Sequence, residues 1–72
     1  MSAVLAHEIA GWNVDHLLGT WRRFGPVGPV YEILSADAEL SDGDRMMRVR
    51  VVETGEEVAY RLSDILDDPR ER

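Results

Sequence analysis

The chain has 72 residues, 44% of them apolar, and carries a formal net charge of −6 from 14 acidic and 8 basic residues. A chain of this length forms one domain and buries only about 60% of its unfolded surface, so its stability margin is small. It has no cysteine, which excludes disulfides and thiolate metal sites and is typical of a reducing cytoplasm. The acidic balance disfavours nucleic acid and anionic membranes as partners and suits a basic protein surface, although solubility alone also explains it.

Residues 1–20 are predicted to form a helical N-terminal segment. Ser2 can cap a first helix that ends at Gly11, and Asn13 can cap a second short turn that ends at Gly19. Neither piece is long enough to be stable alone, so both must pack on the rest of the chain or on a partner. The first residues lack the pattern of a signal peptide, and no stretch approaches the ~20 apolar residues of a membrane span. We therefore expect a cytoplasmic protein.

Residues 21–69 are predicted to form a β meander, because β-branched and aromatic residues alternate with polar ones. The expected strands cover residues 20–24, 29–36, 45–53 and 57–62. Residues 37–44 are acidic, contain Asp-Gly and read as a loop. A helical turn follows the last strand; Ser63 caps it, Ile65 and Leu66 face the core, and Pro69 ends it. Residues 70–72 are expected to be a frayed tail.

The last two predicted strands can be registered against each other as a hairpin. A two-residue turn at positions 54 and 55 places Val49 opposite Tyr60 and Arg48 directly opposite Arg61. Every apolar pair then falls on one face of the sheet, as a pleated hairpin requires. The fold class predicted for the single domain, residues 1–72, is mainly β (α+β). It is a small bent antiparallel sheet or an SH3-like barrel of three to four strands. The largest side chains of the expected core are the aromatic residues Trp12, Trp21, Phe24, Tyr31 and Tyr60.

The stretch RRFGPVGPVYEIL allows two interpretations. Arg23, Pro26 and Pro29 have the R-x-x-P-x-x-P spacing of a polyproline ligand. Gly25 and Gly28, however, occupy positions where such ligands present apolar side chains, and a strong strand follows directly. Each glycine is followed by proline, which has no N–H to donate, so a phosphate-binding nest is also disfavoured. We interpret the stretch as a bend that leads into a strand.

Catalytic and metal sites find little support in the sequence. No G-x-S-x-G motif or histidine-paired nucleophile is present, and carboxylates in loops are expected to keep ordinary acidity. His7 and His16 are nine residues apart and form no zinc motif. We therefore predict no enzyme activity, no cofactor and no metal.

Two sets of charged residues could bind a partner, although solvation alone also explains both. The acidic set could imitate a row of phosphates toward a basic groove, and it comprises Asp37, Glu39, Asp42, Asp44, Asp64, Asp67 and Asp68. The basic set could bind phosphates of nucleic acid from the outer face of the sheet, and it comprises Arg22, Arg23, Arg48, Arg50 and Arg61.

The last fifty residues resemble a family of small uncharacterised bacterial proteins. The resemblance rests on an RRFGPxGPxYE segment at residues 22–32, a VRVxETGEExxYRL segment at residues 49–62 and the dipeptide Asp68-Pro69. It implies motifs of a structural type and no established activity. Short proteins of this kind often occur on mobile elements or beside toxin genes, which is an association only.

These observations favour a non-enzymatic protein-binding module that acts stoichiometrically on a larger partner. Concrete versions are an antitoxin or a phage or mobile-element inhibitor of a nucleic-acid-handling defence complex, of anti-CRISPR type. The expected partner is a basic surface of a larger protein or ribonucleoprotein. No small-molecule substrate and no membrane partner are expected, and the sequence is also compatible with a homodimer. The alternative is a nucleic-acid-binding small barrel that uses the arginine set.

Overall fold

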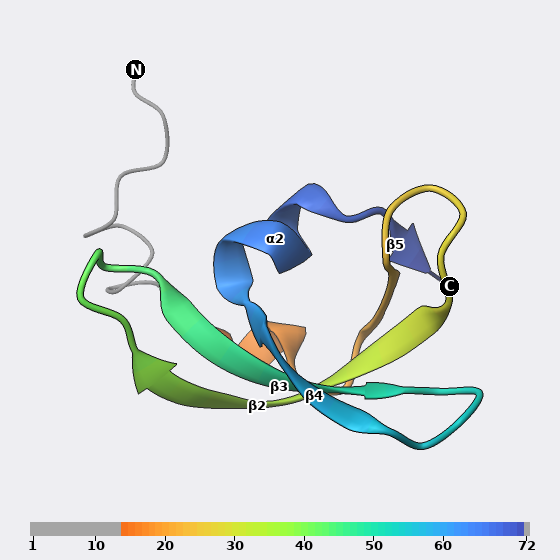
Figure 1. Cartoon of the computed structure of the whole chain (residues 1–72), viewed down its shortest axis with the longest axis horizontal. Coiled ribbons are helices and arrows are strands. Elements are labelled where there is room, and N and C mark those ends of the chain that lie inside the picture. Colours follow the sequence, from red (N-terminus) through yellow and green to blue (C-terminus); the bar gives the residue numbers. More distant parts are fainter. Residues whose placement is uncertain (1–13, 72) are drawn as a thin grey trace.

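The computed structural model describes residues 14–71, which form one bent antiparallel sheet with two short helices (Figure 1). In chain order the elements are η1 (Val14–Leu17), β1 (Trp21–Arg23), β2 (Val30–Glu39), β3 (Arg45–Val51), β4 (Glu57–Arg61), α2 (Leu62–Asp67) and β5 (Arg70–Glu71). The predicted first helix, between Ser2 and Gly11, lies outside the described residues. The short turn predicted before Gly19 is present as η1, and Gly19 ends it with a φ of 83°.

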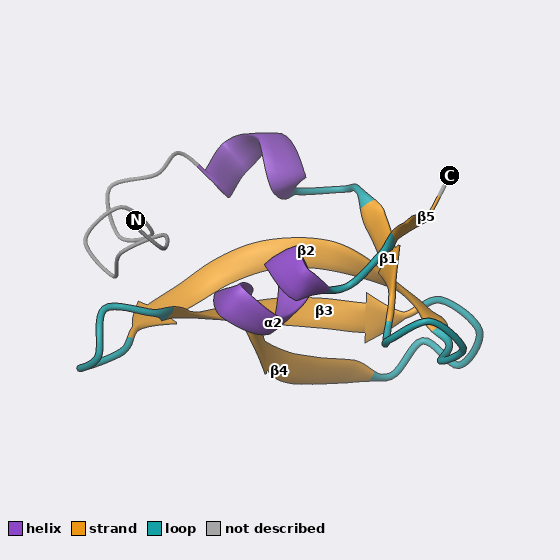
Figure 2. Ribbon diagram, turned by 90° about the horizontal axis from the view of Figure 1, so that it is seen from above, coloured by secondary structure: helices purple, strands orange, loops and turns teal. Residues whose placement is uncertain are grey.

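The strand order is β4-β3-β2-β1-β5, so four consecutive strands form a meander and the fifth returns to pair with the first. The sheet curves strongly, and α2 lies over one of its faces (Figures 1 and 2). Strands β4 and β5 are the two edges in the part of the chain described, so the sheet is open. The predicted mainly β class is confirmed, in its bent-sheet form.

The predicted frayed tail is wrong for Arg70 and Glu71. Both pair antiparallel with β1, Trp21 with Glu71 and Arg22 with Arg70. The backbone N–H of Arg23 also donates to the Pro69 carbonyl at 3.0 Å. These bonds are made by the backbone, so a charged dipeptide can form a strand without the apolar alternation that sequence patterns detect.

The register predicted for the β3–β4 hairpin is wrong by two residues. Val49 lies opposite Val58, and Met47 lies opposite Tyr60. The backbone N–H of Val51 donates to the Glu56 carbonyl at 2.8 Å, which leaves a four-residue turn between those two residues. A shift by two keeps every side chain on its own face, so the apolar pattern allowed both registers.

The core lies between the sheet and the two helices. Each contributing element supplies two buried side chains, spaced two apart on the strands and three apart on the helices. They are Val14 and Leu17, Tyr31 and Ile33, Met47 and Val49, and Leu62 and Ile65. Phe24, Val58 and Tyr60 pack against this cluster while partly exposed. Trp21, expected as a core piece, is 42% exposed on β1.

Residues 24–29 form the loop that joins β1 to β2, and this confirms the interpretation of the R-x-x-P-x-x-P segment as a bend. The N–H of Phe24 donates to the Pro29 carbonyl at 3.0 Å and closes the loop. A Cβ atom on Gly28 would lie 2.0 Å from the Phe24 carbonyl oxygen, so only glycine fits there without a shift of the backbone. The glycine of the second Gly-Pro step is therefore fixed by close packing of the loop on itself.

Candidate protein-binding surface

Asp68 is the acceptor of a hydrogen-bond cluster inside the fold. Its Oδ2 accepts from the hydroxyls of Tyr31 at 2.8 Å and Tyr60 at 2.9 Å, and its Oδ1 accepts from the N–H of Gly25 at 3.1 Å. Its carbonyl accepts from Nη1 of Arg22 at 2.9 Å. Asp68 was predicted to belong to a solvated partner-binding cluster; in the structure its carboxylate holds three segments of the chain together.

The two tyrosines show the electrostatic effect of this arrangement. Burial, followed by the hydrogen bond to Asp68, raises the pKa of Tyr31 far above its ordinary value. The same two causes raise the pKa of Tyr60 to about 12. The rings also pack against Phe24, whose centroid is 4.3 Å from that of Tyr31 and 5.1 Å from that of Tyr60. Both phenols thus act as neutral donors to a carboxylate.

The three segments that carried the resemblance meet at this cluster. Phe24, Gly25 and Tyr31 come from the first segment, Tyr60 belongs to the second, and Asp68 begins the third. Their spacing along the chain hides the contact, because the hydrogen bonds to Asp68 join residues up to 46 positions apart. The structure therefore gives these segments a shared role in closing the fold.

Asp44 is the second carboxylate that serves the fold. It is 7% exposed, its Oδ1 accepts from the N–H groups of Arg45 and Ser63, and its Oδ2 accepts from the Ser63 hydroxyl at 2.6 Å. Burial alone would raise the pKa of Asp44, but these hydrogen bonds outweigh it and hold the pKa below its ordinary value. Asp44 thus satisfies an N–H in the first turn of α2, which corrects two predictions: Ser63 is not the cap, and Asp44 is not free for a partner.

Four of the five arginines in the predicted basic set form ion pairs inside the chain. Arg23 pairs with Glu71 at 3.1 Å, Arg48 with Asp37 at 3.4 Å and Arg50 with Glu32 at 2.6 Å. Arg61 pairs with Asp42 at 2.9 Å and lies 3.4 Å from Asp44. Hydrogen bonding to Arg61 lowers the pKa of Asp42.

The predicted arginine stripe is also broken geometrically. Arg61 lies opposite Met46 and not opposite Arg48, whose partner is Ala59. Arg22 lies opposite the fully buried Tyr31 and is itself 7% exposed, so it belongs to the inner face of the sheet. Arg48 and Arg50 share the outer face of β3. The sheet therefore keeps Arg48, Arg50 and Arg61 on its outer face, with Arg61 diagonal to Arg48, and places Arg22 on the opposite face.

Three members of the predicted acidic set stay directed to solvent without a role in the fold. Asp64 and Asp67 are exposed on α2, three residues apart and hence on the same side of the helix. Glu39 is exposed at the end of β2. Asp37 and Asp42 retain partial exposure while paired, with side chains 34% and 57% accessible. The acidic set is thus divided into internal acceptors and a smaller outward group.

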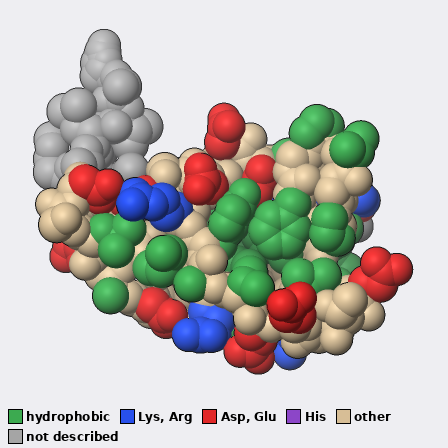
Figure 3. Space-filling view, viewed as in Figure 1, with side chains coloured by type: hydrophobic (Ala, Val, Ile, Leu, Met, Phe, Trp, Pro, Cys, Tyr) green, Lys and Arg blue, Asp and Glu red, His purple; other side chains and the backbone are tan. Residues whose placement is uncertain are grey.

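Apolar side chains gather on the face that carries α2, between the helix and the loop of residues 24–29 (Figure 3). Val27 at the tip of that loop is 93% exposed, and Leu66 on α2 is 36% exposed. Leu66 was expected to face the core together with Ile65, and only Ile65 does so, with no exposed surface. Exposed apolar groups next to carboxylates are the composition of a protein interface, with an apolar centre and a polar rim.

No cluster of histidine, cysteine, aspartate or glutamate that could hold a metal is found within residues 14–71. None of the helices in this range is long and apolar enough to cross a membrane. A pocket lined by Arg22 and Arg70 lies beside η1. Sequence reasoning missed Arg70 because it fell in the expected tail, and only the pairing of β5 with β1 would have revealed it.

The described residues define a small, mainly β protein with exposed carboxylates on α2. The chain belongs to DUF5397, a family of unknown function, whose profile matches residues 8–72. It is also 35% identical over 51 residues to an uncharacterized protein of Haemophilus influenzae, an alignment that covers 71% of this chain and 81% of that protein. The resemblance to a family of small proteins without an assigned activity is thereby confirmed.

Proposed function

We propose that the protein is a non-enzymatic binding module that acts stoichiometrically in the cytoplasm by covering a basic surface of a larger protein or ribonucleoprotein. The observation that carries the proposal is the pair of exposed carboxylates on α2, Asp64 and Asp67, which share one side of the helix, together with the exposed Leu66 next to Asp67 in the chain. Carboxylates near an apolar contact orient the partner and raise the rate of association, while the apolar contact supplies most of the affinity.

The distribution of arginines supports an acidic working surface. Arg23, Arg48, Arg50 and Arg61 have carboxylate partners inside the chain, and Arg22 is buried. Nucleic acid would have to compete with those carboxylates for each guanidinium, which weakens the alternative of a nucleic-acid-binding barrel. An antitoxin and an anti-CRISPR-type inhibitor from a phage or mobile element both need such a surface, since each blocks a partner that handles nucleic acid.

The test is a pull-down from the native host followed by reconstitution with the purified partner. We expect a basic protein that forms a complex of fixed stoichiometry, measured by light scattering after size-exclusion chromatography. Asp64→Lys combined with Asp67→Lys should abolish the complex. The matched control is Glu53→Lys with Glu56→Lys, which makes the same change of charge in the exposed β3–β4 turn and should leave binding within about threefold, because a distant rim charge contributes little at physiological salt.

A gel shift with duplex DNA and single-stranded RNA at low salt tests the alternative. We expect no shift. Salt-sensitive binding that is lost in the Arg48→Glu, Arg61→Glu double variant would overturn the proposal, provided circular dichroism shows that the variant is folded. Equal loss of the protein complex in the α2 and turn variants would also contradict it, since net charge alone would then account for binding.

A further inference from the structure

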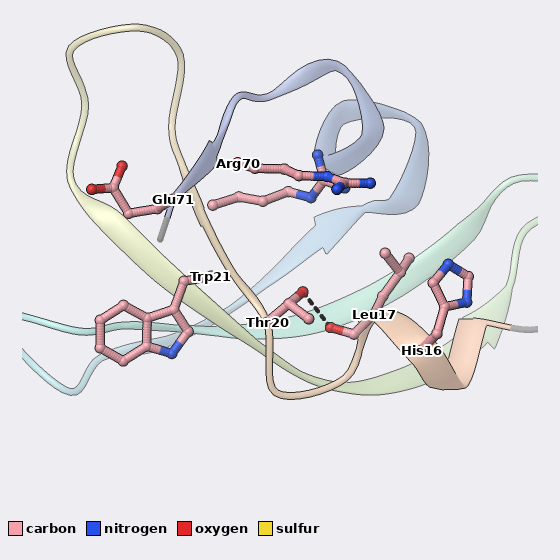
Figure 4. Close-up of a pocket in the computed structure, with 7 residues that line it drawn as sticks. His16, Leu17, Thr20, Trp21, Arg70 and Glu71 are labelled. Atoms are coloured by element: carbon pink, nitrogen blue, oxygen red, sulfur yellow. Dashed lines mark hydrogen bonds between the residues drawn. The ribbon is translucent and has the colours of Figure 1, made fainter.

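A pocket lies where the end of η1 faces the β1–β5 pair, away from the carboxylates of α2. Leu17 and Thr20 line it from one side, and Arg22 and Arg70 line it from the strands. Figure 4 shows Arg70 extending in the direction of His16, whereas Trp21 and Glu71 point the other way. The cationic groups of the pocket are therefore contributed by Arg22 and Arg70, with His16 at its border.

The two arginines are direct cross-strand partners. Arg22 on β1 pairs with Arg70 on β5, so their side chains leave the sheet on the same face. Like charges in this position destabilise a sheet, because their Cβ atoms are only about 5 Å apart. Glu71, which lines the pocket, pairs with Arg23 at 3.1 Å, and the Asp68 carboxylate accepts from Tyr31, Tyr60 and Gly25. The Asp68 carboxylate offsets part of the repulsion by its charge, but it accepts no hydrogen bond from either guanidinium.

One N–H donor of the Arg22 guanidinium also lacks an acceptor. The side chain is 7% exposed, and its Nη1 donates to the Asp68 carbonyl. Its Nε is fully buried and has no acceptor among the described residues. A buried donor of a charged group is rarely left without an acceptor, because the loss of its hydration is not offset. A negatively charged group between the two guanidinium groups would relieve the repulsion between the two arginines.

We propose that this pocket binds the oxyanion group of a small ligand, a phosphate or a carboxylate, between Arg22 and Arg70. The planar fork of an arginine matches the oxygens of either group. The Thr20 hydroxyl donates to the Leu17 carbonyl at 2.6 Å, so the anion is held by the arginines and not by the hydroxyl. This site is separate from the surface proposed for protein binding, because no residue of α2 lines the pocket.

The experiment is a titration of the full chain with inorganic phosphate, ribose 5-phosphate and acetate, each at constant ionic strength, followed by NMR. The reporter is the Nε–H signal of Arg22, which should shift and saturate with one of the oxyanions and not with chloride. Saturation with both phosphates and not with acetate would assign the site to phosphate. Tighter binding of ribose 5-phosphate than of inorganic phosphate would indicate a larger ligand, and saturation with acetate would assign a carboxylate.

Arg70→Ala should weaken binding by about tenfold or more, as expected when a charge-assisted hydrogen bond is lost. Arg45→Ala is the matched control, because it removes the same charge at the start of β3, outside the pocket, and should leave the affinity unchanged. If Arg70→Ala does not fold, Arg70→Lys keeps the charge, loses the fork and should still bind more weakly. An Arg22 signal that no oxyanion shifts, or equal binding by the Arg70 and Arg45 variants, would overturn the proposal.

Discussion

Replacing Asp68 with asparagine should destabilise the fold far more than the same change at its neighbour Asp67. The substitution keeps the shape of the side chain, removes its charge and turns one of its two acceptor oxygens into an NH2 donor. The carboxylate accepts three hydrogen bonds, from Tyr31, Tyr60 and Gly25, whereas Asp67 is exposed on α2. The comparison therefore isolates the effect of the internal carboxylate.

The expected loss in the free energy of unfolding follows from the number of hydrogen bonds that no longer involve a charged acceptor. A hydrogen bond to a charged group contributes about 1.5–3 kcal/mol, and one between neutral groups about 0.5–1.5 kcal/mol, so each bond weakens by about 1 kcal/mol. Asp68 is partly accessible to water, which reduces the total for three bonds to about 2–3 kcal/mol. A domain of this size has about 4–11 kcal/mol of stability in all. The loss is thus a large fraction of the whole and lowers Tm by roughly 10–20 °C.

Urea unfolding followed by far-UV circular dichroism measures the effect directly. Asp68→Asn should lower the midpoint without changing the slope, and Asp67→Asn should stay within about 0.5 kcal/mol of the natural sequence. A double-mutant cycle with Tyr31→Phe should show coupling of about 1 kcal/mol, because the two side chains share a hydrogen bond. Equal stability of the two asparagine variants, or full additivity in the cycle, would refute the assigned role of Asp68.

The other stability predictions concern the loop, the phenols and the buried carboxylate. Gly28→Ala should cost about 1–3 kcal/mol, since the new Cβ would lie 2.0 Å from the Phe24 carbonyl oxygen, whereas Val27→Ala at a 93% exposed position should be nearly neutral in thermal melts. The stability that Tyr60 contributes should be complete below pH 10 and lost as the pH rises to about 12, because its pKa is raised in the folded chain; Tyr60→Phe should make this alkaline loss shallower in urea unfolding at fixed pH values. The contribution of Asp44 depends on pH in the opposite direction. Its pKa is lowered from 3.8 in the folded chain, so the stability that Asp44 contributes is complete above that pH and is lost as the pH falls through the lower folded pKa. Asp44→Asn should flatten this acid limb, and an unchanged limb would contradict its role at the start of α2.

The parts of the fold with strong alternation could be predicted from the sequence. Strands β2, β3 and β4 follow the alternation of apolar and polar residues, which places Ile33, Val49 and Val58 side by side on one face of the sheet. The register of the β3–β4 hairpin could not be predicted, because pairings that differ by two residues bury the same side chains. Strand β5 could not be predicted either, since its bonds are made by the backbone of Arg70 and Glu71.

The sequence also could not show which charged residues serve the fold and which face solvent, and the reason is different. An aspartate that accepts hydrogen bonds from distant residues and one that faces water are the same letter in the sequence, and Asp44 and Asp68 differ from Asp64 only in what the fold brings to them. Arg22 could not be placed from the sequence either. Alternation along β1 must direct either Arg22 or its two neighbours inward, and only the exposure of Trp21 in the structure shows which of the two faces is outside.

Pro69 determines which of two adjacent aspartates serves the fold. Proline disfavours helical backbone at the residue before it, and Asp68 accordingly is extended, with φ −83° and ψ 147°. That change of direction takes the Asp68 carboxylate off the helix and toward Tyr31 and Tyr60, while Asp67, the last helical residue, keeps its side chain in solvent. Charge reversal at positions 64 and 67 therefore tests binding with little risk to folding. Reversal at position 68 would remove the acceptor of both phenols, and any loss of binding in that variant would report on folding.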